Sequence, residues 1–209
     1  MFKRILTFSL AIWLAACAGA RVKEIPADVR DYKRVDFFTQ GRTQAAFKVM
    51  GQMDDNYMDG VLRIKKIGDR DYDIVLMTGA AYRLLHATVS PEGIAYRYLF
   101  KDADTAAVRA RIGQFLNLLV SDAGRYQSRR IKKDGVTITY QGQDAKEKFF
   151  YHPGEFYPYA AQTVTVLNTA DLSYTEYAPF DASGDEEVPH VLVYKDGNIT
   201  LDLTLISLR

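Results

Sequence analysis

Between residues 71 and 120, the hydrophobic and polar positions change from the pattern of strands to that of a helix. Three runs rich in β-branched and aromatic residues, 72–77, 82–89 and 94–100, are separated by turns that contain Gly or Pro, which is typical of consecutive strands. From Ile74 onward, both faces of the first run are apolar, which predicts that this part of the sheet is covered on both sides.

The stretch that follows the third strand has helical periodicity. Asp102 or Asp104 can provide the N-cap, and apolar residues then recur every three or four positions. The members of this apolar side are Val108, Ile112, Phe115, Leu116 and Leu119. Arg109, Arg111 and Asn117 lie elsewhere on the helix. We therefore expect one amphipathic helix packed on a meander of antiparallel strands.

Most of the remaining chain continues the strand pattern. Further strands are predicted at residues 37–53, 57–67, 125–131, 136–140, 163–167, 172–177, 191–194 and 199–208 and, less regularly, at 146–152. Gly41 inside the first of these predicts a bulge or a sharp coil of the sheet. The fold class is therefore mainly β (α+β): a strongly curled antiparallel sheet of about ten or eleven strands that either closes or carries the helix across its open side.

The composition supports a folded domain and excludes one class of partner. The chain has 209 residues, of which 48% are hydrophobic and 12% aromatic, enough for one domain with a sizeable core. Since 27 basic residues stand against 26 acidic ones, no overall field favours nucleic acid, and we expect no nucleic-acid partner.

The start of the chain has the arrangement of a signal peptide. Lys3 and Arg4 are followed by an apolar run, residues 5–14, that is too short to span a bilayer as a mature helix. The run closes with Leu14-Ala15-Ala16-Cys17, which resembles the lipobox of bacterial lipoproteins. The alternative is an ordinary secretory signal with an incidental cysteine, but Cys17 is the single cysteine of the chain.

The lipobox resemblance implies cleavage before Cys17 and attachment of acyl chains such as palmitate to it. We expect a signal peptide at 1–16, a lipidated tether at 17–34 and the β domain at 35–209. Loss of Lys3 and Arg4 changes the formal charge from +1 to −1 (+1 − 2). Ala18, not Asp, follows Cys17. By resemblance to lipoprotein sorting in two-membrane bacteria, this implies an outer-membrane protein that faces the periplasm.

Several turns and strand ends resemble a known family. They are Phe38, Gly41-Arg42, the Gly79 turn, the Ser90-Pro91-Glu92-Gly93 turn, the helix start at 102–105, and the C-terminal Val188-Pro189-His190-Val191, Asp196-Gly197 and Leu201-Asp202-Leu203. The chain resembles the lipoprotein localisation factors (LolA/LolB-like), most of all the member that is itself a lipoprotein. The resemblance implies a half-open β-barrel with an apolar concave face, a helical lid and a cavity for the acyl chains of a lipid or lipoprotein, which the protein transports or inserts.

Two segments depart from that family. Its receptor member carries a protruding Leu in the turn that matches residues 78–81, where this chain has Gly79, Ala80 and Ala81. A segment with Pro and Trp after the helix is also missing, because Asp122-Ala123-Gly124 leads directly into a strand. A paralogous lipid-binding lipoprotein therefore fits as well as a lipoprotein-inserting one.

The predicted strands and helix supply candidates for the cavity and its lid. The cavity candidates are Ile74, Leu76, Leu85, Tyr96 and Tyr98, and the lid candidates are Val108, Ile112, Phe115 and Leu119. The alternative is that these side chains fill the barrel, as in small barrels generally. The protein would then be a non-enzymatic assembly or structural lipoprotein of the envelope.

No arrangement of residues predicts catalysis or a cofactor. His86, His152 and His190 lie far apart without the spacing of a metal site, and we expect a structural, hydrogen-bonded role for His86. The sequence lacks a Gly-x-Ser-x-Gly motif. The acidic stretch 181–187 matches no calcium loop and is interpreted as solvated. The aromatic run 149–159 either borders the cavity or a membrane interface or packs over one end of the sheet.

Overall fold

The computed structural model describes residues 27–29, 31–39, 41–53, 56–120, 124–142, 145–165, 168–180 and 187–209. The predicted signal peptide, Cys17 and most of the predicted tether lie outside the described residues. Within the described part of the chain, no helix is both long enough and apolar enough to cross a membrane.

Twelve strands and three helical elements occur in the described ranges. The strands are β1 (Gln44–Met53), β2 (Asn56–Lys66), β3 (Tyr72–Thr78), β4 (Arg83–Ser90), β5 (Gly93–Leu99), β6 (Arg125–Lys132), β7 (Gly135–Gln141), β8 (Lys146–Tyr151), β9 (Ala160–Val164), β10 (Thr169–Pro179), β11 (Glu187–Asp196) and β12 (Ile199–Leu208). The helical elements are η2 (Ala27–Val29), η3 (Lys101–Ala103) and α2 (Ala106–Val120). The predicted class is confirmed, with twelve strands instead of about ten or eleven.

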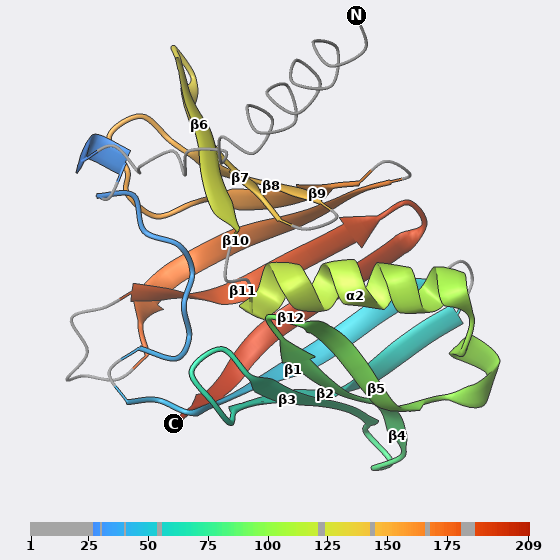
Figure 1. Ribbon diagram of the computed structural model, residues 1–209. Helices are drawn as coiled ribbons and strands as arrows, with labels where there is room; N and C mark the ends of the chain where they lie inside the picture. The colour runs from blue at the N-terminus through green and yellow to red at the C-terminus, as the bar shows by residue number, and fades with distance from the viewer. Residues whose placement is uncertain are drawn as a thin grey trace, which may run out of the picture.

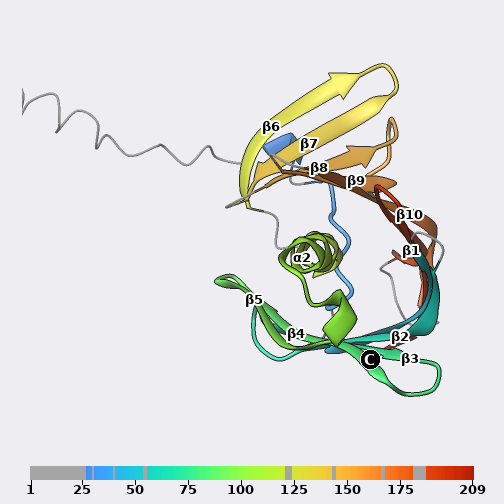
Figure 2. The ribbon, with the colours of Figure 1, turned by 90° about the vertical axis from the view of Figure 1, so that its right-hand side faces the viewer.

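All twelve strands form one antiparallel sheet in the order β5-β4-β3-β2-β1-β12-β11-β10-β9-β8-β7-β6. The first and last strands, β1 and β12, pair with each other, so that the meanders β1–β5 and β6–β12 become one continuous surface. Strands β5 and β6 are its two edges, and the sheet does not close. α2 lies across the concave face (Figure 1). A view close to the helix axis shows the sheet curling as an open arc around it (Figure 2).

The core lies between the concave face and α2. On β7, alternate residues are buried, as expected for a strand with one side toward the core. On β3, the side chains of Val75 and Met77 point to the opposite face and are half-buried. The strand is therefore covered by α2 on one face and only in part on the other, where Val75 pairs with Arg63 of β2 and His86 of β4.

The segment before β1 is a loop with a buried interior side. Phe37 and Phe38 are buried in a turn, and Gly41, with a φ of +81°, lies in the next turn, ahead of the start of β1. The strand predicted at 37–53 therefore starts too early, because aromatic residues buried in a loop give the same apolar signal as a strand. The irregularity in β1 lies instead between Ala46 and Phe47, in the pairing with β12.

Packing against the sheet begins upstream of these turns. Val29 is 1% exposed, Asp28 forms an ion pair with Arg129, and the Tyr32 ring meets Tyr151 edge-on at 4.9 Å. Packed residues thus precede residue 35, where the domain was expected to start.

The start of α2 differs from the prediction. Neither Asp102 nor Asp104 caps it, because Asp102 lies in η3 and Thr105 is the residue directly before the first residue of α2. The Thr105 hydroxyl accepts a hydrogen bond from the Val108 amide at 3.2 Å, which is N-cap geometry. Asp104 instead forms two hydrogen bonds with Arg109, at 2.5 and 3.0 Å, and this partner lowers the pKa of its carboxyl group.

Candidate ligand-binding site

A cavity of about 460 Å³ lies between α2 and the concave face of the sheet. Its volume is within the range of small-molecule sites. Its apolar lining comes from both meanders, η3 and α2, and includes Met58, Leu62, Leu76, Leu84, Leu85, Leu99, Phe100, Ala103, Val108, Ile112, Phe115, Ile199 and Leu201. Asp59 and Arg111 are the charged members among the described lining residues.

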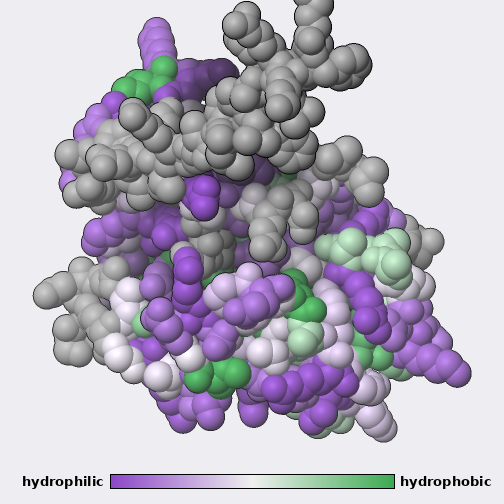
Figure 3. Space-filling view, viewed as in Figure 1, coloured by the Kyte–Doolittle hydropathy of each residue, from purple (hydrophilic) through white to green (hydrophobic). Residues whose placement is uncertain are grey.

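α2 turns three apolar residues toward the cavity. Val108, Ile112 and Phe115 are spaced by four and three positions, so they share one side of the helix. In the space-filling view from the side of α2, hydrophilic and neutral residues dominate the described surface, and hydrophobic ones form small, separate groups (Figure 3). The apolar side of the helix therefore faces the interior of the molecule.

A glycine in β1 keeps part of the cavity open. A Cβ atom on Gly51 would lie 2.6 Å from Cδ2 of Leu201 and 3.2 Å from Cε of Met58. Both atoms are ends of flexible side chains that line the cavity. A larger residue at position 51 would displace them into the hollow.

The structure brings some of the predicted cavity residues together and separates others. Leu76 and Leu85 line the cavity, and Ile74 lies fully buried in the core. Tyr96 lies on another side of α2, where its hydroxyl donates to the Arg109 carbonyl oxygen at 2.6 Å, and burial raises its pKa. Tyr98 is 42% exposed and does not line the cavity.

The position of Tyr98 follows from a bulge between β4 and β5. Tyr96 pairs with Ala87 and Tyr98 with His86, so the partner register shifts by one residue between them. A one-residue slip moves a side chain to the other face of the sheet. Strict alternation along β5 would place Tyr96 and Tyr98 on the same face of the sheet, and the bulge is the reason why this prediction is wrong for Tyr98.

Of the predicted lid residues, Val108, Ile112 and Phe115 line the cavity, whereas Leu119 is buried in the core. Sequence reasoning missed the contribution of the C-terminal hairpin. The alternation of Ile199 and Leu201 with polar residues identified a buried face, but placing that face beside β1 requires the β1–β12 pairing, for which the sequence has no local signal.

No protein-family model matches the chain, and no curated protein matches it by sequence. Among solved structures, a LolA superfamily protein from Nitrosomonas europaea is similar, with a TM-score of 0.57 and 13% identity over 87% of this chain and 90% of that one. This chain has a LolA-like fold. A domain assigned to outer membrane lipoprotein sorting from Vibrio parahaemolyticus has a TM-score of 0.45 and 6% identity over 80% of this chain and 84% of its own. A DUF1329 family protein from Desulfovibrio piger has a TM-score of 0.45 and 8% identity over 83% and 87%.

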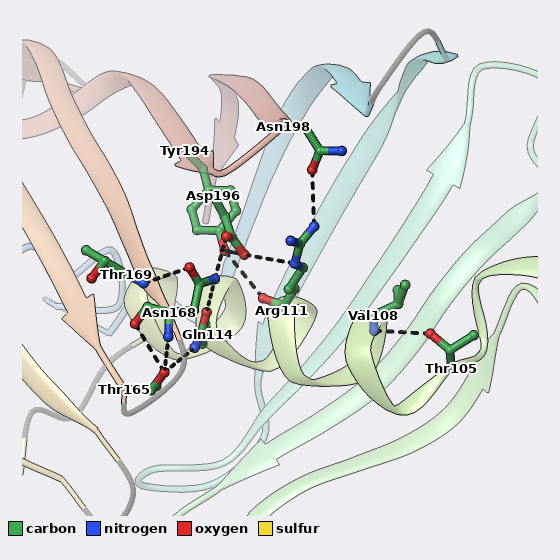
Figure 4. A network of polar contacts seen from close by, with 10 residues as sticks. All are labelled: Thr105, Val108, Arg111, Gln114, Thr165, Asn168, Thr169, Tyr194, Asp196 and Asn198. Carbon is green, nitrogen blue, oxygen red and sulfur yellow. Dashed lines mark hydrogen bonds and ion pairs between the residues drawn. The ribbon is translucent and has the colours of Figure 1, made fainter.

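In this LolA-like fold, a polar network attaches α2 to the sheet (Figure 4). At its centre, the Asp196 carboxylate is fully buried, with Arg111 Nε at 3.7 Å and the donating Asn168 amide at 2.5 Å. The Tyr194 hydroxyl donates to Asp196 at 3.5 Å. Burial, and then the charge of Asp196, raises the pKa of Tyr194, which keeps this donor protonated. A buried carboxylate is stable only with such partners.

The network continues along the helix. Gln114 donates to the Thr165 hydroxyl at 3.4 Å and accepts from Asn168 at 3.5 Å. The buried residues of α2 begin at Phe115, whereas Ala106 and Ala107 are exposed. α2 is therefore fixed at its C-terminal half, while its first turns cover the cavity with few buried contacts.

The other predicted candidates lie outside this site. His86 contacts Asp73, with Nε2 and Oδ1 2.9 Å apart, as expected for a hydrogen-bonded structural histidine. His152 stacks on Tyr159, and His190 lies near Phe180. The described residues contain no group of three or more His, Cys, Asp or Glu placed to hold a metal ion. Cys17 and residues 181–186 are not among the described residues.

Proposed function

We propose that this chain is an outer-membrane lipoprotein that faces the periplasm and holds acyl chains of a lipid or lipoprotein in the cavity under α2, for transport or insertion. The observation that carries the proposal is the apolar hollow of about 460 Å³ in a LolA-like fold. The alternative, a structural lipoprotein with a filled interior, is less well supported because the space between α2 and the sheet is not filled.

The proposed mechanism is partition, without a chemical step. Each methylene moved from water into the cavity contributes about 0.8 kcal/mol, so a chain of a dozen contributes roughly 10 kcal/mol before ordering costs. Two of the described lining residues are charged, and the positive charge of one of them, Arg111, is compensated by the Asp196 carboxylate. The lining therefore favours the aliphatic part of a ligand.

Entry requires part of the lid to move. The first turns of α2 have exposed alanines and follow η3, where Ala103 and the preceding residue Phe100 line the cavity. Segments with few buried contacts open at low free-energy cost. We propose that η3 and the first turns of α2 move together, while the Asp196 network holds the rest of the helix.

The proposed anchor keeps the domain close to the membrane. From Cys17 to Val29, the first of the described residues that is buried in the core, the chain advances twelve residues (29 − 17). A fully extended chain spans at most about 3.3–3.6 Å per residue, so the linker reaches roughly 40 Å. A ligand that leaves the cavity is thus released near the bilayer.

The test is native mass spectrometry of residues 18–209, produced without the anchor, followed by lipid extraction. A stoichiometric lipid in the purified protein, or uptake of added fatty acid or phospholipid, is the expected result. A protein that stays free of lipid in both experiments contradicts acyl-chain binding and favours the structural lipoprotein.

Two neighbouring positions on β3 provide a matched pair of variants. Leu76→Asn places an amide in the cavity wall, whereas Val75→Asn places the same amide on the opposite, half-buried face. We expect Leu76→Asn to weaken lipid binding by about tenfold or more, because a polar group displaces apolar contact area, and Val75→Asn to leave it unchanged. Equal affinities in the two variants would count against the cavity as the binding site.

A further inference from the structure

A second hollow, of about 1080 Å³, shares no lining residue with the cavity under α2. We call it the acidic bowl. It is formed by residues 31–33, the loop between β8 and β9, the end of β10 and the first residue of β11. Most of its lining residues are exposed, so the bowl is wide and open to water.

The charges of the acidic bowl are unbalanced. Four exposed carboxylates line it, from Asp31, Glu155, Glu176 and Glu187. Among the contacts of the described residues, none of these carboxylates has an ion pair or a side-chain hydrogen bond. The lining cation Lys33 is already engaged, since its Nζ donates to the Tyr157 hydroxyl at 2.9 Å and lies 4.9 Å from the centre of that ring.

Aromatic rings are also among the lining residues of the bowl. Phe156 is 50% exposed and Tyr159 is 38% exposed. His152 stacks on Tyr159, with ring centres 4.2 Å apart. Beneath them, the Tyr177 hydroxyl donates to the Pro158 carbonyl oxygen at 2.7 Å, which fixes the loop to β10. Two large rings are therefore presented to solvent by a loop that is held in place.

Glu176 occupies its position with a strained backbone. Its φ is +55°, a region that Gly and Asn adopt more easily than a long side chain does. Here the ladder between β10 and β11 is interrupted, since Thr175 and Tyr177 have partners on β11 and Glu176 has none. Backbone strain of this kind clusters at functional sites. In this case it sets a carboxylate beside the aromatic rings.

The chemistry of the bowl selects cations. The faces of aromatic rings attract ammonium and guanidinium groups, and carboxylates bind them through charge-assisted hydrogen bonds. A small cation would stay largely in water in so open a hollow, whereas a peptide segment can bring several cations to the separate carboxylates.

We propose that the acidic bowl is a docking surface for a cationic segment of a partner protein. Arg or Lys side chains of that segment lie over Phe156 and Tyr159 and pair with the four carboxylates. The proposal does not depend on lipid binding in the cavity, and either can fail alone.

The test is fluorescence anisotropy of the full chain in neutral detergent with a labelled peptide of alternating Arg and Ser, and with the same peptide in which Gln replaces Arg. We expect the Arg peptide to bind, the Gln peptide to bind about tenfold or more weakly, and added salt to weaken the binding. Equal binding of the two peptides, or no binding of either, overturns the proposal.

Three variants assign the binding to the bowl. Glu155→Gln combined with Glu176→Gln, and separately Tyr159→Ala, should each weaken binding of the Arg peptide by about tenfold. Asp102→Asn removes an exposed carboxylate from η3, outside the bowl, and should leave binding unchanged. Circular dichroism confirms that each variant is folded. If Asp102→Asn weakens binding as much as the others, or if the bowl variants bind normally, the peptide does not dock in the bowl.

Discussion

The buried carboxylate beside the cavity under α2 and the exposed carboxylates of the acidic bowl differ in whether the chain provides partners for them. At the border of the cavity, Asp196 is 1% exposed and has partners in Arg111, Asn168 and Tyr194. In the bowl, four carboxylates are exposed and have no partner among the described residues. A buried charge has to be compensated by the chain that buries it, whereas exposed carboxylates remain available. The Asp196 carboxylate therefore serves the fold, whereas the four carboxylates of the bowl have no such structural role among the contacts of the described residues.

The aromatic residues of the two regions differ in the same sense. Phe115 is buried and packs against Tyr194, with ring centres 4.9 Å apart. Phe156 presents half of its surface to water. A buried ring contributes to the free energy of folding, while an exposed ring contributes little and is free to contact a partner. The comparison thus predicts opposite patterns of stability and binding for matched substitutions.

The largest expected difference is between Phe115→Ala and Phe156→Ala. Phe115→Ala should lower the free energy of unfolding by about 3 kcal/mol, because it removes buried contacts and enlarges the cavity. Phe156→Ala should lower it by less than about 0.5 kcal/mol. Urea denaturation of both variants measures these values. Similar losses would mean that the loop of the bowl is as integral to the core as α2 is.

The next effect concerns the charge of Asp196. Arg111→Ala leaves a buried carboxylate without its cation and should lower the free energy of unfolding by about 2 kcal/mol. The loss is smaller than for a fully buried pair because the Arg111 side chain is 40% exposed. Adding Asp196→Asn to Arg111→Ala should recover part of it, since a neutral amide needs no cation.

Arg109 provides the control for that variant. It lies two residues from Arg111 on the same helix and pairs with Asp104 in water. Arg109→Ala should have a much smaller effect, because solvent screens an exposed pair. If both arginines matter equally, α2 is held by its general charge pattern and not by the Asp196 network.

Much of the fold could be predicted from local patterns. The hairpins on either side of Asp196-Gly197 and Asp134-Gly135 were predicted from turn residues and strand alternation, and their pairing is confirmed. The apolar side of α2 was also predicted, because helical spacing depends on near neighbours alone. These features need no knowledge of where the rest of the chain lies.

The errors come from effects that local patterns do not contain. The bulge that turns Tyr98 outward depends on how β5 pairs with β4, and the place of Ile199 in the cavity depends on the pairing of β12 with β1. Arg111 was expected only to lie off the apolar side of the helix, yet its partner Asp196 is distant in sequence. The acidic bowl likewise joins residues 31–33 to β10 and β11, segments that no spacing rule connects.

The smallest effect tests whether the bowl is maintained at a cost to stability. Glu176→Asn keeps a polar side chain, and Asn tolerates a positive φ better than Glu does. The variant should therefore be more stable by about 0.5–1 kcal/mol. Glu155→Asn removes the same charge from the same bowl, at a position without a positive φ, and should change stability little.

Stability and binding measured on this pair separate strain from charge. Both variants should bind the Arg peptide more weakly, because each lacks one carboxylate, but only Glu176→Asn should gain stability. Such a gain would mean that the native chain retains a residue that strains its backbone and weakens its fold, which is expected where that residue contacts something outside the fold. Equal stability of the two variants would remove the strain argument. The bowl would then have to be judged on its charge and exposed rings alone.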